Sequence, residues 1–170
     1  PFEKELKEAV ATPSFHDVPR QAKKTWKKLA LILPGGGARG AIEVGGMKTL
    51  WRHGIIPDVI IGSSVGSINS AIIASGRTPD ELEQIWLRLS KKLLFPLNFR
   101  VFWQLYGVRS LARTVNIKKV IKEGVKTDYF EECKIPLYLI TTRLSDGEAV
   151  YFNKGPLRDA LLASLAIPPY

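Results

Sequence analysis

The sequence has few of the side chains that build disulfides and metal sites. Its 170 residues include one cysteine, Cys133, and two histidines, His16 and His53. A single cysteine cannot form a disulfide within the chain, and beside Glu132 and Lys134 we expect Cys133 to be structural. No cluster of His, Cys and carboxylate side chains has metal-ligand spacing, so the sequence implies no metal and no other cofactor.

Long apolar runs are also scarce. Residues 59–76 are uncharged, but their glycines, their serines and Asn69 make a poor lipid-facing helix, so we expect no transmembrane segment. Apolar residues make up 45% of the chain, which is enough for one domain with a substantial core. The chain begins with Pro1, so a signal peptide before it would be invisible. The location stays open, with the cytoplasm or a membrane surface favoured.

Acidic side chains are nearly absent from residues 88–126. This stretch holds ten Lys and Arg residues against one acid, Glu123, and so accounts for the formal net charge of +9. Between residues 91 and 116, aromatic side chains alternate with the cations. Such interleaving is typical of lipid-contacting surfaces, of proteins that stack single-stranded nucleic acid, and of segments that pack into a domain. The residues alone leave these interpretations open. The aromatic residues are Phe95, Phe99, Phe102, Trp103 and Tyr106.

The sequence does contain two glycine-rich turns, each between an apolar run and a helix-like pattern. The second turn, Gly62-Ser63-Ser64-Val65-Gly66, follows the β-branched run 59–61, which suits a strand buried on both faces. A chain that passes from strand to helix in so few residues must bend sharply, and Gly62 and Gly66 leave room for the two elements to cross. Ser64 would lie at the tip of the bend, beside the unpaired N–H groups of the following helix. The pattern indicates a nucleophile.

The first turn, Gly35-Gly36-Gly37-Ala38-Arg39-Gly40, suits a cradle for negative charge. Consecutive glycines let main-chain N–H groups approach a developing oxyanion. Arg39 either orients this loop and attracts an anionic head group, or is a surface residue that caps a carbonyl.

The same loop supports a competing hypothesis, a nucleotide-binding domain. Gly35, Gly37 and Gly40 match G-x-G-x-x-G, and Asp58 lies near the offset at which a ribose-binding acid is expected. Against this hypothesis, Asp58 begins the next strand, whereas a ribose-binding acid ends one. The fingerprint also leaves residues 62–66 unexplained.

Alternating strands and helices predict an α/β sheet covered on both sides. His53 falls in the last turn of one helix, where the helix dipole favours a partly positive imidazole, and a role as catalytic base is a minor alternative. The predicted strands are 29–33, 59–61, 136–142 and 148–152, the last two antiparallel, and the predicted helices are 41–53, 65–76, 78–90, 117–123 and one that begins at Pro156.

Four stretches resemble the patatin-like phospholipase family of lipid acyl hydrolases. They are GGGARG, PDVIIGSSVGSINSA, YLITTRLSDGEAVYF and LRDALLASLAIPP, and they extend from about Leu29 to the C-terminus. The resemblance implies a three-layer α/β sandwich with a mainly parallel sheet, incomplete at its C-terminal end. Residues 1–28 would be a basic extension, and residues 29–170 the catalytic domain.

The resemblance also implies hydrolysis of acyl esters in phospholipids or related lipids, through an acyl-enzyme at Ser64. The expected partners are the lipid substrate and a membrane surface, without nucleic acid. A non-catalytic lipid-binding domain of the same fold is a further hypothesis. The implied oxyanion-hole residues are Gly35, Gly36, Gly37, Ala38, Arg39, Gly40 and Val65, with Gly62 and Gly66 in the nucleophile elbow.

A serine nucleophile needs a base. In the family this base is an aspartate in Asp-Gly-Gly or Asp-Gly-Ala, whereas Asp146-Gly147, the only Asp-Gly in this chain, is followed by Glu148. Because Asp-Gly is also a turn signal, we expect Asp146 to lie in a hairpin turn. The family's aspartate should lie beyond Tyr170, and residues 1–170 alone should show little turnover.

Overall fold

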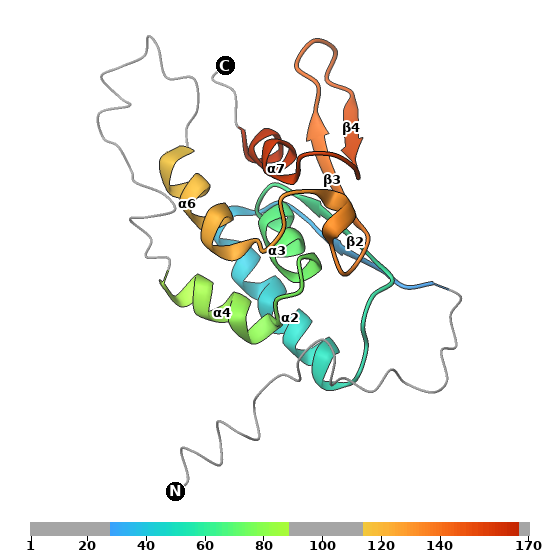
Figure 1. The fold of residues 1–170 in the computed structure, drawn as a ribbon, viewed down its shortest axis with the longest axis vertical. Helices are drawn as coiled ribbons and strands as arrows, with labels where there is room; N and C mark the ends of the chain where they lie inside the picture. Colours follow the sequence, from blue (N-terminus) through green and yellow to red (C-terminus); the bar gives the residue numbers. More distant parts are fainter. Residues whose placement is uncertain (1–27, 89–113, 167–170) are drawn as a thin grey trace, which may run out of the picture.

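A four-stranded sheet organises the described part of the chain. The computed structural model describes residues 28–88 and 114–166 (Figure 1). The elements are β1 (Ala30–Leu33), η1 (Gly37–Arg39), α2 (Gly40–Arg52), β2 (Val59–Ser63), α3 (Val65–Ala74), α4 (Pro79–Arg88), α6 (Thr114–Gly124), η3 (Phe130–Glu132), β3 (Leu137–Thr142), β4 (Ala149–Phe152) and α7 (Leu157–Leu165). The strand order is β1-β2-β3-β4, in which β1, β2 and β3 are parallel and β4 is antiparallel to β3.

This arrangement confirms the predicted α/β fold with a mainly parallel sheet. Each predicted strand and helix is present, and the largest shift in a described boundary is at α6, which begins at Thr114 instead of Ile117. Pro156 is the residue before α7 and not its first residue. Its φ of −65° still suits the start of a helix.

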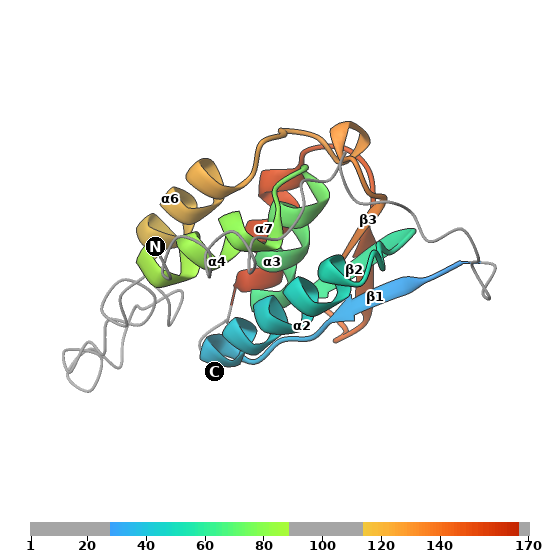
Figure 2. The same ribbon diagram turned by 90° about the horizontal axis from the view of Figure 1, so that it is seen from below.

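The described helices lie on one face of the sheet (Figure 2). Leu33, Ile60 and Leu139 point into the helical layer and are buried, whereas Ile32, on the opposite face, is 64% exposed. Ile61 is only half buried, so the expected burial of this run on both faces is not found in the described residues. Ile61 is partly exposed because the described helices cover only the opposite face of the sheet.

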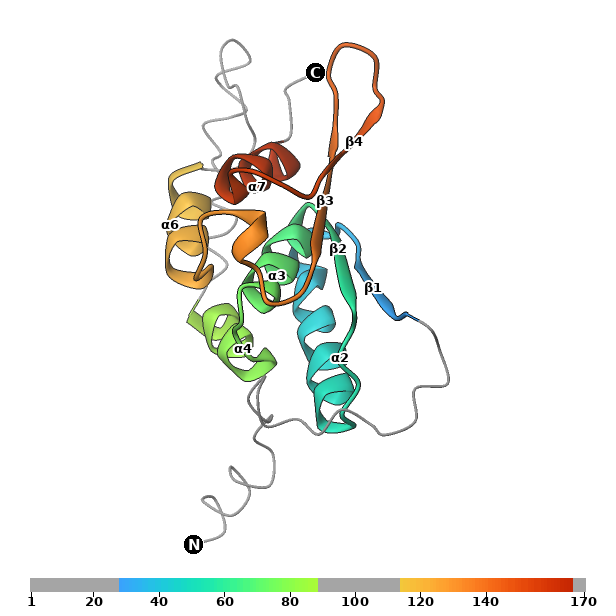
Figure 3. The ribbon, with the colours of Figure 1, turned by 45° about the vertical axis from the view of Figure 1, so that its right-hand side comes forward.

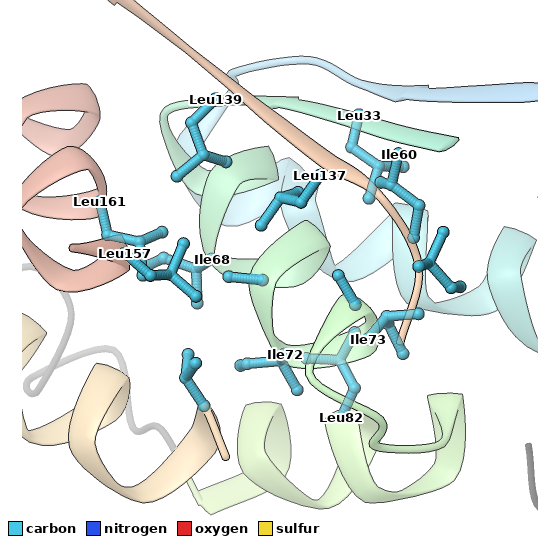
Figure 4. Packing of buried hydrophobic residues seen from close by; sticks show 14 of the residues in the cluster. Leu33, Ile60, Ile68, Ile72, Ile73, Leu82, Leu137, Leu139, Leu157 and Leu161 are labelled. Atoms are coloured by element: carbon cyan, nitrogen blue, oxygen red, sulfur yellow. The ribbon is translucent and has the colours of Figure 1, made fainter. Parts of the chain in front are cut away.

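Helix α3 fills the centre of the core. Each of its ten residues is buried. Figure 4 shows Ile68 of α3 close to Leu157 and Leu161 of α7, and Ile72 and Ile73 farther along the helix, close to Leu82 of α4. A helix that is buried on all sides occupies such a central position, and its polar residues Ser67, Asn69 and Ser70 are buried with it. The packing fixes the N-terminal end of α3, where the second glycine-rich turn lies.

Some predicted features lie outside the described residues. They are most of the N-terminal extension, residues 1–27, and the aromatic and cationic segment within residues 89–113. In the two ranges that the structure describes, no helix is long and apolar enough to cross a membrane.

Candidate active site

The two glycine-rich turns lie side by side. β1 and β2 are parallel neighbours, and Leu33 at the end of β1 pairs with Gly62 near the end of β2. The loops that follow parallel strands meet at the same edge of a sheet. A Cβ on Gly35 would therefore lie 3.1 Å from Ser64 Cβ and 3.8 Å from Ser64 Oγ. The structure brings together the two motifs that the sequence singled out.

Ser64 occupies a strained bend between β2 and α3. Its backbone has φ 52° and ψ −124°, and among the described residues it is the only non-glycine residue with a positive φ. Such a conformation costs about 1–3 kcal/mol and persists only where the surrounding structure enforces it. Because β2 ends at Ser63 and α3 begins at Val65, the bend is confined to Ser64.

The flanking glycines are required by close packing. A Cβ on Gly62 would lie 2.5 Å from Ser70 Oγ and 2.7 Å from the Gly66 carbonyl oxygen. A Cβ on Gly66 would overlap the Leu33 carbonyl group. Neither glycine has a positive φ. They therefore allow the first turn of α3 to cross the ends of the strands.

The first glycine-rich loop leads from β1 into α2 beside the bend. Gly37, the first residue of η1, has φ 58°, a conformation that favours glycine. Gly40, the first residue of α2, is buried, and a Cβ there would lie 2.7 Å from Val65 Cγ2. The Arg39 side chain folds back over Gly36, and its Cβ would be 3.4 Å from a Gly36 Cβ. Gly35 and Gly36 themselves are exposed, so a ligand can approach their backbone.

Asn69 joins this loop to two helices. Its side chain is fully buried, and its Nδ2 donates hydrogen bonds to the Gly40 carbonyl (2.9 Å) and to Glu43 Oε2 (2.7 Å). Its Oδ1 accepts a hydrogen bond from Trp86 Nε1 at 2.9 Å. Burial raises the pKa of the Glu43 carboxyl, and the hydrogen bond from Asn69 opposes that shift. We missed this role from the sequence, although an amide within an apolar run was a visible signal.

Another residue missed from the sequence contacts the bend directly. Ser164, in the last turn of α7, accepts a hydrogen bond from the Ser64 N–H at 3.0 Å. The two residues are 100 positions apart, so no local sequence pattern links them.

The candidate bases lie away from Ser64. Asp146 Oδ1 accepts the Glu148 N–H at 3.0 Å, and its Oδ2 pairs with Arg143 at 3.0 Å, so the carboxylate closes the hairpin turn as expected. This hairpin of β3 and β4 extends beyond the helices (Figure 3). His53 Nδ1 lies 2.8 Å from the Thr49 carbonyl oxygen, at the end of α2 remote from Gly40 and therefore roughly 20 Å along the helix. In the described ranges, no carboxylate hydrogen-bonds to Ser64 Oγ.

Asp58 lies at the opposite end of the strands from the glycine loop. Its carboxylate accepts the Leu29 N–H at 2.8 Å, just before β1 and β2 begin. It is therefore badly placed to bind a ribose whose phosphates would occupy the Gly35 to Gly40 loop. This geometry disfavours the nucleotide-binding hypothesis.

In the part of the chain that the structure describes, the remaining reactive side chains form no second site. Cys133 is half buried, and burial raises the pKa of its thiol. Thr127 Oγ1 lies 3.8 Å from its sulfur. Among the residues that the structure describes, no group of three or more His, Cys, Asp or Glu residues could hold a metal ion.

Fold and site together define an α/β protein with a serine at a strained strand-to-helix bend beside a glycine-rich loop. The Patatin-like phospholipase family matches residues 31–170. The chain therefore belongs to this family, as the sequence motifs predicted.

Similar proteins agree with this assignment. The chain is 30% identical over 141 residues to an uncharacterised NTE family protein of Mycobacterium tuberculosis, covering 83% of this chain and 38% of that protein. It is 28% identical over 167 residues to neuropathy target esterase sws of Drosophila persimilis, covering 95% of this chain and 11% of that protein. It is 27% identical over 149 residues to human patatin-like phospholipase domain-containing protein 6, covering 86% of this chain and 10% of that protein. The chain thus spans well under half the length of these relatives.

Solved structures share the fold. Full-length ExoU, from the type III secretion system of Pseudomonas aeruginosa and in complex with SpcU, has a TM-score of 0.55 and 21% identity, covering 83% of this chain and 38% of that chain. A further ExoU structure has a TM-score of 0.51 and 17% identity, covering 82% and 40%. At these identities the likeness bears on the fold alone.

Proposed function

We propose that this protein hydrolyses acyl esters of phospholipids or related lipids through an acyl-enzyme at Ser64. The observation that carries the proposal is the φ of 52° at Ser64, directly beside the Gly35 to Gly40 loop. Membership of the Patatin-like phospholipase family, with a relative named as an esterase, supports the substrate class.

The chemistry follows the general scheme of acyl transfer. Ser64 Oγ attacks the acyl carbonyl carbon, and its proton passes to a general base. The carbonyl oxygen becomes an oxyanion, which accepts hydrogen bonds from the N–H groups of Gly36, Gly37 and Val65. Collapse of this intermediate breaks the bond to the alcohol, which leaves with a proton. Water then attacks the acyl-enzyme in the same manner and releases the fatty acid.

Each oxyanion donor matters because charge develops on the oxygen in the transition state. Loss of one such donor costs about 2.7–4 kcal/mol in other enzymes. The Val65 N–H suits this role because it belongs to the first turn of α3, where N–H groups have no intrahelical acceptor. The general base in this proposal is the family's aspartate, which we expect beyond Tyr170.

The test uses the complete gene product and phospholipid vesicles. Release of free fatty acid should be catalysed by the wild-type protein and should fall at least about 1,000-fold in Ser64→Ala. Ser75→Ala is the control, because Ser75 is also a buried serine with hydrogen bonds, to Ile72 and Lys126, but lies at the other end of α3. Circular dichroism should show that both variants are folded. Hydrolysis that survives in folded Ser64→Ala would refute the proposal, and nucleotide binding without hydrolysis would favour the competing hypothesis.

A further inference from the structure

Ser164 forms a junction of hydrogen bonds behind the strained bend. Its Oγ lies 3.0 Å from the Ser64 backbone nitrogen, 2.7 Å from Ser67 Oγ and 2.7 Å from the Ile140 carbonyl oxygen. These partners belong to the bend, to α3 and to β3, whereas Ser164 itself belongs to α7. One hydroxyl therefore links four parts of the fold.

The direction of each hydrogen bond follows from the available protons. The Ile140 carbonyl can only accept, so it receives the single hydroxyl proton of Ser164. Ser164 Oγ then has two lone pairs, which accept the Ser64 N–H and the Ser67 hydroxyl proton. The junction uses the full hydrogen-bonding capacity of the Ser164 hydroxyl.

The junction is well placed to hold the backbone of Ser64. Ser63, the residue before the bend, pairs with Ile140 in the sheet, so the acceptor of the Ser164 proton is fixed by strand pairing. The Ser64 N–H therefore points toward α7, where it donates its hydrogen bond to Ser164 Oγ, and it does not face the substrate side of the bend. Without this acceptor, the positive φ of Ser64 would lose one of the interactions that enforce it.

We propose that Ser164 is a positioning residue, which holds Ser64 in the conformation that presents its Oγ to the substrate. This inference rests on the proposed function in so far as Ser64 is the nucleophile. Ser164 does not touch the substrate. Its effect should therefore appear in the rate of attack and not in substrate binding.

The experiment compares Ser164→Ala, Ser164→Thr and the control Ser75→Ala in the complete gene product. Ser164→Ala should lower kcat and the rate of fluorophosphonate labelling at least about 10-fold, with KM changed less than about twofold, because misplacement of a nucleophile by 1 Å can cost about 100-fold. Ser164→Thr keeps the hydroxyl and should retain activity within about threefold. Ser75→Ala also removes a buried hydroxyl, and it should keep kcat.

A second readout tests the hydrogen bond without any reference to catalysis. Amide hydrogen exchange, followed by NMR, should show at least about 10-fold weaker protection of the Ser64 N–H in Ser164→Ala, with unchanged protection at Ile72 in the C-terminal half of α3. If Ser164→Ala does not fold, Ser164→Cys replaces it, because a thiol is a weak donor and acceptor, and the same changes are expected.

The outcomes separate the two proposals. If the wild-type protein hydrolyses no lipid ester, the proposed function fails, and the exchange of the Ser64 amide still decides whether Ser164 holds the bend. The positioning role is overturned if Ser164→Ala keeps kcat and labelling rate, if Ser75→Ala lowers them equally, or if the protection of the Ser64 amide does not change.

Discussion

At the scale of single residues, the space around Ser64 decides which side chains the bend tolerates. Gly66 lies against the carbonyl groups of Leu33 and Pro34, which are backbone atoms and cannot move aside as a flexible side chain would. Gly45, on the exposed face of α2, has no atom within 4 Å of a hypothetical Cβ. Both glycines lie in helices, but only Gly66 is required by close packing, whereas the position of Gly45 has room for a side chain.

We predict opposite effects for alanine at these positions. Gly66→Ala should destabilise the protein by about 3 kcal/mol or more, because overpacking against backbone forces α3 away from β1. Gly45→Ala should stabilise it by about 0.5–1 kcal/mol, because alanine costs less backbone entropy in a helix. Urea denaturation of both variants provides the measurement. Equal midpoints would show that the close crossing of α3 and β1 is wrong.

The residue scale also shows what the sequence could predict. Ser64 and the Gly35 to Gly40 loop were predictable as neighbours, because each follows a strand of one parallel sheet. Asn69 and Ser164 were not predictable, because their partners come from other elements and depend on how helices pack. Asp146 is a different case, since its place in a hairpin turn was predictable from the glycine that follows it, and the position of the general base stays a prediction.

At the scale of elements, α3 is an apolar helix whose one buried amide connects it to α2 and α4. The strand and helix positions were predictable from β-branched runs, glycines and prolines. The burial of β2 was not predictable from its sequence, because the burial of each face of a strand depends on which other elements pack against that face of the sheet. Asn69 offers a direct test of how these elements are joined.

Asn69→Ala should cost about 2–4 kcal/mol, because it removes the partner of the Trp86 indole N–H and of the Gly40 carbonyl. It should also lower kcat, since Gly40 ends the glycine-rich loop. Trp86→Phe removes only the hydrogen bond from the indole N–H to Asn69, so it should retain more activity than Asn69→Ala. Thermal denaturation and ester hydrolysis measure the two effects, and an unchanged kcat in Asn69→Ala would contradict the link to the loop.

The loss in Asn69→Ala should depend on pH. Burial already raises the pKa of Glu43 above its ordinary value of 4.5, and the Asn69 hydrogen bond opposes this shift. Without Asn69 the pKa of Glu43 rises further in the folded state. A carboxyl with a raised pKa contributes stability below its unfolded pKa and loses it as pH rises through the folded pKa. The destabilisation should therefore be larger at pH 7 than at pH 4.

At the scale of the whole molecule, the distribution of charge favours binding to an anionic membrane surface. The cationic stretch 88–126 continues into the described part as α6, where Lys118, Lys119 and Lys122 are exposed. Anionic lipid surfaces attract such residues within about a Debye length. The role of residues 91–113 in this attraction remains a prediction, because they lie outside the described residues.

We expect binding to vesicles to rise with anionic lipid and to fall with added salt. Replacing Lys118 and Lys122 with glutamate should weaken vesicle binding at least about 10-fold, because two cations at roughly 1 kcal/mol each near the surface correspond to about 30-fold in affinity. A matched change of Lys28 and Lys154, which are exposed outside the cationic stretch, should have a smaller effect. Equal binding to neutral and anionic vesicles at every salt concentration would contradict the electrostatic attraction.

The central claim, that Ser64 is the nucleophile, is tested most directly by the site of covalent labelling. The complete gene product should be treated with a fluorophosphonate, and the modified peptide should then be mapped by mass spectrometry. Our account predicts one adduct per chain, on Ser64, and none on folded Ser64→Ala. An adduct on Ser63 or Ser67, or full labelling of Ser64→Ala, would contradict it.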